Sequence, residues 1–146
     1  MITFEEKELV SVYVAGAITP TNRLKHPQVE FLENIQRGIS ICLDLISRGY
    51  APLCTFFDFL YFLIPKESRL TIETIHKVST ALMCRCEILF VSPGSEKSSG
   101  TKKEIKKAKE LGKPICRTYK ALDECRKKIL SERRLLESHR RKNGNT

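Results

Sequence analysis

Hydrophobic residues gather in short continuous runs that alternate with longer stretches of helical spacing. The short runs lie at residues 9–15, 50–54, 88–91 and 114–116. Runs of this length that are apolar on both faces are typical of buried strands in a parallel sheet. Pro52 lies within the second run and favours a position near the edge of the sheet. The pattern therefore predicts four strands.

The intervening stretches carry apolar residues at three- and four-residue spacing, which indicates helices with one apolar face. Helices are predicted over residues 27–48, 70–83 and 99–111, and a very polar one over residues 118–139. Gly49 is a fitting C-terminal stop for the first helix, and residues 140–146 are predicted to be disordered. The predicted buried face of the first helix consists of Phe31, Leu32, Ile35, Ile39, Cys42, Leu43 and Ile46.

Strands and helices alternate along the chain, which predicts an open parallel α/β sheet. Ligands of such sheets bind outside the carboxyl ends of the strands. Three loops follow those ends, at residues 16–22, 55–58 and 92–104. We therefore expect these loops to converge on one crevice.

The segment at residues 56–64 holds eight apolar residues and one acid, Asp58. It is either a lid or pocket wall that also contacts a second subunit, or a buried helix. A buried helix leaves Asp58 unexplained, because an unpaired buried carboxylate is costly. Near an apolar wall, an acid of this kind has a raised pKa and can donate a proton to a leaving group.

The net charge is +9, and the basic residues are concentrated after residue 116. This basic helix is either a solvated surface or a site that attracts nucleic acid. No apolar run has the ~18–20 residues needed to span a bilayer, and the N-terminus does not resemble a signal peptide. The six cysteines are interpreted as reduced thiols of a cytoplasmic protein. No metal or cofactor is predicted.

Glu104 ends the small-residue loop that follows the third strand. It is either part of a capping box formed by residues 101–104 or a carboxylate nucleophile that points into the crevice. Tyr13, near the end of the first strand, is either a core aromatic or a hydroxyl that hydrogen-bonds to such a carboxylate. Residues 98–101 have the composition of a phosphate cradle, but they match neither of the common nucleotide-binding glycine motifs.

Several motifs resemble the nucleoside 2-deoxyribosyltransferase-like superfamily. They are Val-Tyr-Val-Ala-Gly-Ala-Ile-Thr at residues 12–19, Cys-Glu-Ile-Leu-Phe-Val-Ser-Pro-Gly at residues 86–94, Ser-Gly-x-x-x-Glu at residues 99–104 and Gly-Lys-Pro-Ile at residues 112–115. The Ser-Gly-x-x-x-Glu element is the most specific of them. The resemblance covers residues 9–117, so we expect a domain over residues 1–117 and a basic helix and tail over residues 118–146.

The resemblance implies a flavodoxin-like (Rossmann-like) open parallel sheet of four to five strands flanked by helices. It implies enzymes that cleave or transfer the N-glycosidic bond of a (deoxy)nucleoside or its 5′-monophosphate through a covalent glycosyl-glutamate intermediate. Glu104 matches the nucleophile and Tyr13 the tyrosine that orients it. Family members often form dimers that share active sites, so a homodimer or higher homo-oligomer is expected. The implied substrate-binding residues are Gly16, Ala17, Ile18, Ser79, Gly94, Ser98, Ser99 and Gly100.

The chain departs from the family at the position of the aspartate that contacts or protonates the leaving base, which is Ser79 here. Asp58, Glu73 or His76 are the candidates to replace it. Two hypotheses follow: an N-glycosidic-bond enzyme, and a catalytically impaired nucleotide-binding module of the same fold. A third hypothesis is nucleic-acid binding through the basic tail.

Overall fold

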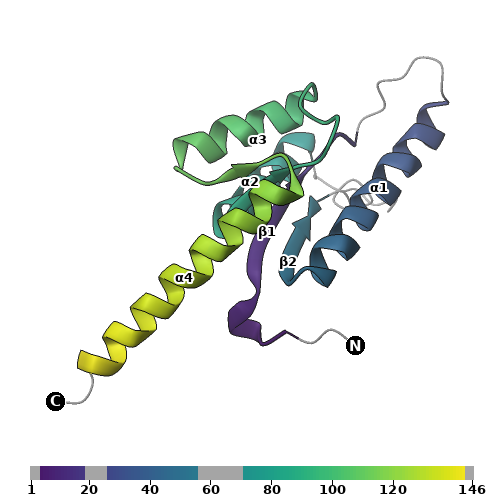
Figure 1. Ribbon diagram of the computed structural model, residues 1–146. Helices are drawn as coiled ribbons and strands as arrows, with labels where there is room; N and C mark the ends of the chain where they lie inside the picture. The colour runs from purple at the N-terminus through teal and green to yellow at the C-terminus, as the bar shows by residue number, and fades with distance from the viewer. Residues whose placement is uncertain (1–3, 19–25, 56–70, 144–146) are drawn as a thin grey trace.

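Four parallel strands form the centre of the protein, in the order β2-β1-β3-β4 (Figure 1). The structure is a computed structural model that describes residues 4–18, 26–55 and 71–143. The strands are β1 (Val10–Ala15), β2 (Tyr50–Cys54), β3 (Ile88–Val91) and β4 (Ile115–Cys116), and a short 3₁₀ helix, η1 (Glu6–Glu8), precedes them. The predicted open, flavodoxin-like parallel sheet is confirmed, with four strands in the described part of the chain.

β1 is one of the two inner strands, and its apolar run is buried on both sides. Tyr13 pairs with Leu53 of β2 and with Leu89 of β3. β2 lies at the edge of the sheet. Proline has no backbone N–H, and an edge strand tolerates this because one of its sides has no neighbouring strand to bond. The prediction of an edge position for this strand is therefore confirmed.

Two helices cover each face of the sheet. They are α1 (Pro27–Ser47) and α4 (Tyr119–Asn143) on one face, and α2 (Ile72–Arg85) and α3 (Ser99–Glu110) on the other. Because successive side chains of a strand point to opposite faces, β1 contributes to both cores. One core contains Val10, Val12, Val14, Ile41, Leu45 and Leu122, and the other contains Tyr13, Ala15, Met83, Leu89 and Ala108.

The inner face of α1 differs from the predicted one. Ile41 and Leu45 are buried, whereas Leu32 and Leu43 are 64% and 63% exposed. The helix carries apolar residues at helical spacing on two sides, and periodicity alone cannot choose the side that meets the sheet. The helix was predicted correctly, but the assignment of Leu32, Ile39, Leu43 and Ile46 to its buried face is wrong.

The last helix is anchored to the start of the chain through its arginines. Arg126 donates to the backbone oxygens of Gly49 at 3.2 Å and Glu8 at 3.1 Å, and Arg133 donates to that of Leu9 at 3.0 Å. Figure 1 shows the C-terminal half of α4 projecting beyond the sheet. Because the helix continues to Asn143, the prediction of disorder from residue 140 is wrong for residues 140–143.

Two further sequence predictions concern the apolar segment after β2 and membrane-spanning helices. The apolar segment at residues 56–64, including Asp58, lies outside the described residues. No helix among the residues that the structure describes is both long and apolar enough to cross a membrane.

Candidate functional site

A cavity of about 320 Å³ lies where the sheet ends, between α2 and the start of α3. Its floor is formed by Gly16 and Ile18 after β1 and by Thr55 after β2. The three predicted loops thus contribute to one cavity to the extent that they are described. Its volume is at the lower end of the range for small-molecule sites, which is roughly 300–1,000 Å³.

Glu104 lines the cavity and is held there by a hydrogen bond from β1. The Tyr13 hydroxyl donates to Glu104 Oε1 at 2.6 Å, and the same hydroxyl lies 3.0 Å from Thr55 Oγ1. Tyr13 is fully buried, so its ring is fixed by the core while its hydroxyl reaches the carboxylate. The arrangement fixes one carboxylate oxygen and leaves the other oxygen for a ligand.

Of the two alternatives for Glu104, the capping box at residues 101–104 is wrong. α3 begins at Ser99 with Ser98 as its N-cap residue, so Thr101 already lies inside the first turn. Glu104 points to Tyr13 rather than back to a cap N–H. The carboxylate is therefore available at the cavity instead of closing its own helix.

Burial dominates the electrostatics of Glu104. Removal from water raises the pKa of its carboxyl to about 7, although the hydrogen bond from Tyr13 acts in the opposite direction. Within the described residues no cation counters the effect of burial. The group exchanges its proton near neutral pH, which suits a nucleophile or a base.

The N-terminus of α3 forms the second wall, and its groups favour an anion. Ser98, Ser99, Gly100 and Thr101 line the cavity there, where the first backbone N–H groups of a helix have no partners in the helix. The Thr101 hydroxyl is 1% exposed and has no hydrogen-bond partner among the described residues. A buried polar group of this kind is a ligand-binding candidate, because leaving it unpaired is costly.

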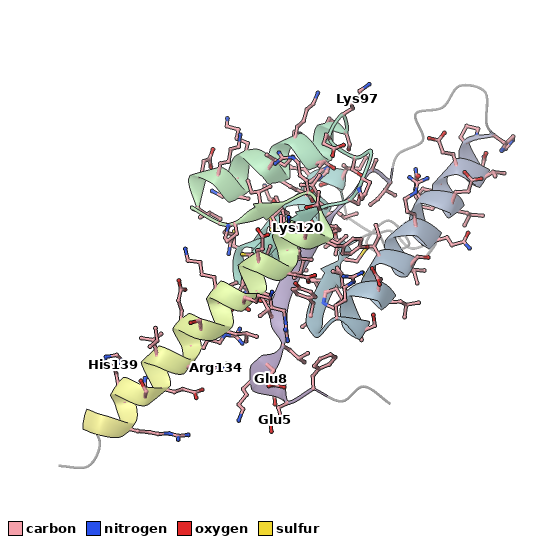
Figure 2. The ribbon with its side chains drawn as sticks, in the orientation of Figure 1. Glu5, Glu8, Lys97, Lys120, Arg134 and His139 are labelled. Atoms are coloured by element: carbon pink, nitrogen blue, oxygen red, sulfur yellow. The ribbon has the colours of Figure 1, made fainter. Side chains whose placement is uncertain are left out.

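Lys97 adds a positive charge to this wall. Its side chain belongs to the lining, and Figure 2 shows it at the loop that leads into α3. The residue is exposed, and its side chain extends outward from that loop (Figure 2). Its positive charge therefore acts on the α3 side of the cavity from the outside.

The face of α2 forms the third wall and differs in chemistry from the α3 wall. Ile72, Ile75, His76 and Ser79 line the cavity from positions spaced three and four residues apart. Two isoleucines beside an imidazole and a hydroxyl make a surface that is apolar in part and offers two polar groups. Such a surface fits a flat heterocycle, whereas the α3 wall fits an anion.

The comparisons with known proteins place the sequence in a family. The chain belongs to the DUF7768 family. The match spans residues 26–118, more than half of the chain, and the family is described as a domain of unknown function. No curated protein and no solved structure matches the chain.

The DUF7768 match extends from the residue before α1 through β4, so it includes Glu104 and the α3 wall, whereas Tyr13 lies before it. The hydrogen bond between Tyr13 and Glu104 therefore joins a residue outside the matched region to one inside it. β1 supplies the centre of the sheet against which the matched strands β2 and β3 pair.

Most residues predicted to form the site meet at the cavity of this DUF7768 protein. Glu104, Gly16, Ile18, Ser79, Ser98, Ser99 and Gly100 line it, and Tyr13 contacts Glu104. Ala17 and Gly94 do not belong to the described lining. The Ala17 N–H donates to Ser95 Oγ at 3.0 Å, which ties the loop after β1 to the loop after β3. Gly94 has a φ of +81° in the turn, a conformation that favours glycine.

The three candidates for a proton donor differ in their position relative to the cavity. Glu73 forms an ion pair with Lys77 at 2.8 Å on the exposed side of α2 and is not part of the lining. His76 lines the cavity, and Asp58 lies outside the described residues. Sequence reasoning did not single out the lining residues Val14, Thr55, Ile72, Ile75 and Lys97. Thr55 and Lys97 lie in two of the loops predicted to form the crevice, and the helical spacing of the two isoleucines with Ser79 was a signal that could have located them.

Proposed function

We propose that this protein cleaves or transfers the N-glycosidic bond of a (deoxy)nucleoside or nucleoside 5′-monophosphate. The observation that supports this most is the 2.6 Å hydrogen bond from Tyr13 to Glu104 in a cavity at the strand ends. The motifs that resemble the nucleoside 2-deoxyribosyltransferase-like superfamily provide these two residues. The geometry adds that they are in contact and that the carboxyl exchanges its proton near neutral pH.

In the proposed reaction, the Glu104 carboxylate attacks C1′ of the sugar. A C1′–O bond to Glu104 forms as the C1′–N bond breaks, and the electron pair of that bond leaves with the base. Water or a second base then attacks C1′ and releases Glu104 as a carboxylate. This double displacement follows the logic of retaining glycosidases.

The hydrogen bond from Tyr13 orients the nucleophile. It engages Glu104 Oε1, so the other carboxylate oxygen is free to attack. Because the donated hydrogen bond stabilises the charged form, it also keeps part of the carboxyl ionised despite burial.

The α3 wall supports a monophosphate as the charged end of the substrate. Three kinds of donor gather there: the backbone N–H groups of the helix start, the Thr101 hydroxyl and the Lys97 ammonium. A phosphate dianion accepts several hydrogen bonds and gains from the positive end of the helix. Its sugar would then lie beside Glu104, one turn further along the same helix.

The test is base release from a panel of nucleosides and 5′-monophosphates, measured chromatographically and combined with thermal shifts. We expect Glu104→Ala to abolish release of free base while stabilisation by the ligand persists. Glu110→Ala is the matched control, because Glu110 is exposed on the same helix and contacts only Lys107, at 3.5 Å, among the described residues. A Glu104→Ala variant that turns over at the parent rate would show that the assignment is wrong.

A nucleotide-binding module without turnover is the second candidate function. It is favoured by Ser79, which lines the cavity at the position of the family's base-contacting acid. A serine hydroxyl binds a base by hydrogen bonds but is too weak an acid to protonate it. Ligand-induced stabilisation without base release from any member of the panel would support this candidate, and the absence of both would exclude the two candidates together.

We also propose a cytoplasmic location. Cys42, Cys54, Cys116 and Cys125 are free thiols that pack in one hydrophobic core. Neighbouring free thiols persist in a reducing compartment.

A further inference from the structure

Cleavage of an N-glycosidic bond is helped by a group that gives a proton to the departing base. The base leaves with the electron pair of the C1′–N bond, so an ordinary purine departs as an anion unless it receives a proton. Proton transfer of this kind contributes roughly 10²–10⁴-fold to a rate. A proton donor must therefore reach the side of the cavity that holds the base.

Three ionisable side chains line the cavity in the described part of the chain: Glu104, Lys97 and His76. Glu104 is the proposed nucleophile, and Lys97 lies beside the anion-binding start of α3. His76 lies on the α2 wall, on the same helical face as Ile75 and Ser79. It is therefore the titratable group of the wall that fits a heterocycle.

We infer that His76 is the residue that donates a proton to the departing base, an inference that rests on the proposed function. His76 is exposed and belongs to the lining of the cavity, on the wall that fits the base. No hydrogen bond from its ring to another described residue competes with this role. Glu73, one turn earlier, pairs with Lys77 instead.

The proton balance closes over the two steps. As Glu104 attacks C1′, the His76 imidazolium transfers a proton to a ring nitrogen of the purine, and the base leaves as a neutral molecule. The neutral imidazole then takes a proton from the water that attacks C1′. The sugar leaves with a hydroxyl at C1′, Glu104 is again a carboxylate, and His76 is again an imidazolium.

The experiment compares two substrates that differ in their need for a proton. 2′-Deoxyguanosine 5′-monophosphate requires protonation of its base, whereas its N7-methyl derivative already carries a positive charge on the base and leaves as a neutral molecule. We expect His76→Ala to slow base release from the first substrate about 100-fold or more and from the second by less than about threefold. Glu104→Ala should abolish release from both, because both need the nucleophile.

Glu73→Ala is the control for changes to α2 that do not reach the cavity, and it should behave like the parent protein. Equal losses on both substrates in His76→Ala would overturn the inference, because they indicate a role in binding or folding. An unchanged rate on 2′-deoxyguanosine 5′-monophosphate would also overturn it. If the parent protein released no base from either substrate or from any member of the panel, the proposed function would fall and the inference with it, and this outcome is distinct from a selective failure of His76.

Discussion

Two glutamates at opposite ends of the sheet differ in the hydrogen-bond donors that surround their carboxylates. Glu87 precedes β3, and it accepts hydrogen bonds from the Ser11 N–H at 2.9 Å, the Ser11 hydroxyl at 3.0 Å and Arg133 at 2.5 Å. Glu104 lies beyond the other end of the strands and accepts one hydrogen bond from the described residues, from Tyr13. The number and charge of the donors around each carboxylate separate the two sites.

The two pKa values move in opposite directions for this reason. Burial by itself would raise the pKa of Glu87, but the hydrogen bonds from Ser11 and Arg133 together outweigh burial and lower it. At Glu104 burial outweighs the single hydrogen bond and raises the pKa to about 7. Glu87 is thus a fixed charge that ties α4 to the sheet, whereas Glu104 is a carboxyl that gains and loses its proton under physiological conditions.

The largest effect should appear when each glutamate is replaced by glutamine and base release is measured. Glu104→Gln is expected to lose about 10⁴-fold or more in kcat, as expected for removal of a catalytic group. Glu87→Gln should stay within about threefold, because Glu87 lies at the far end of the sheet. Comparable losses in the two variants would remove the functional distinction between them.

The free energy of unfolding should depend on pH, because the ionised Glu104 carboxylate is destabilised by burial. A carboxyl whose pKa is raised on folding contributes stability that is full below the unfolded value of 4.5 and is lost as the pH rises through about 7. At about 1.4 kcal/mol per unit, the loss amounts to about 3 kcal/mol above pH 8. Glutamine does not titrate, so Glu104→Gln should be more stable than the parent at alkaline pH.

Urea unfolding at about pH 4, 6 and 8 measures this effect. The stability difference between Glu104→Gln and the parent protein should grow with pH across the series. A difference that stays constant, or that shrinks with rising pH, would mean that the carboxyl is not destabilised by burial.

Glu87 should show the opposite dependence, with a smaller amplitude. Its lowered pKa gives stability that is present above the unfolded value and is lost as the pH falls through the folded value. Glu87→Gln should therefore lower the free energy of unfolding at pH 7 by about 1–2 kcal/mol, and the difference should vanish in acid. Arg133→Gln supplies the matched variant, since the two substitutions should be non-additive if the pair acts as one unit.

The sequence predicts this molecule best where the signal is local. β3 is an uninterrupted apolar run, and the start of α3 follows from the small residues before Ser99. The candidate site came from the motif that contains Glu104 and from the resemblance that joined it to Tyr13. Spacing along the chain could not do this, because the two residues are 91 positions apart.

Contacts between distant or ambiguous residues could not be predicted in the same way. Glu87 and Arg133 are 46 positions apart and share no motif, so nothing in the sequence pairs them. α1 has two apolar sides, and only tertiary packing selects the one with Leu45. His76 is itself exposed, next to the buried Ile75 and Ser79, and composition does not distinguish the edge of a cavity from bulk solvent.

The smallest effect should come from removing the one hydrogen bond that Glu104 has. The Tyr13 hydroxyl lowers the pKa of Glu104 against the effect of burial, so Tyr13→Phe should raise that pKa above 7. The acidic limb of the profile of kcat/KM against pH should then move upward by about one to two units, because a hydrogen bond to a charged group contributes about 1.5–3 kcal/mol. Tyr50→Phe is the matched control, since the Tyr50 hydroxyl donates to Asp123 at 2.8 Å on the other face of the sheet. That variant should leave the limb in place.

A limb that stays fixed in Tyr13→Phe would mean that burial alone sets the pKa of Glu104. The contrast with Glu87 would then rest on solvent exclusion rather than on the number of donors.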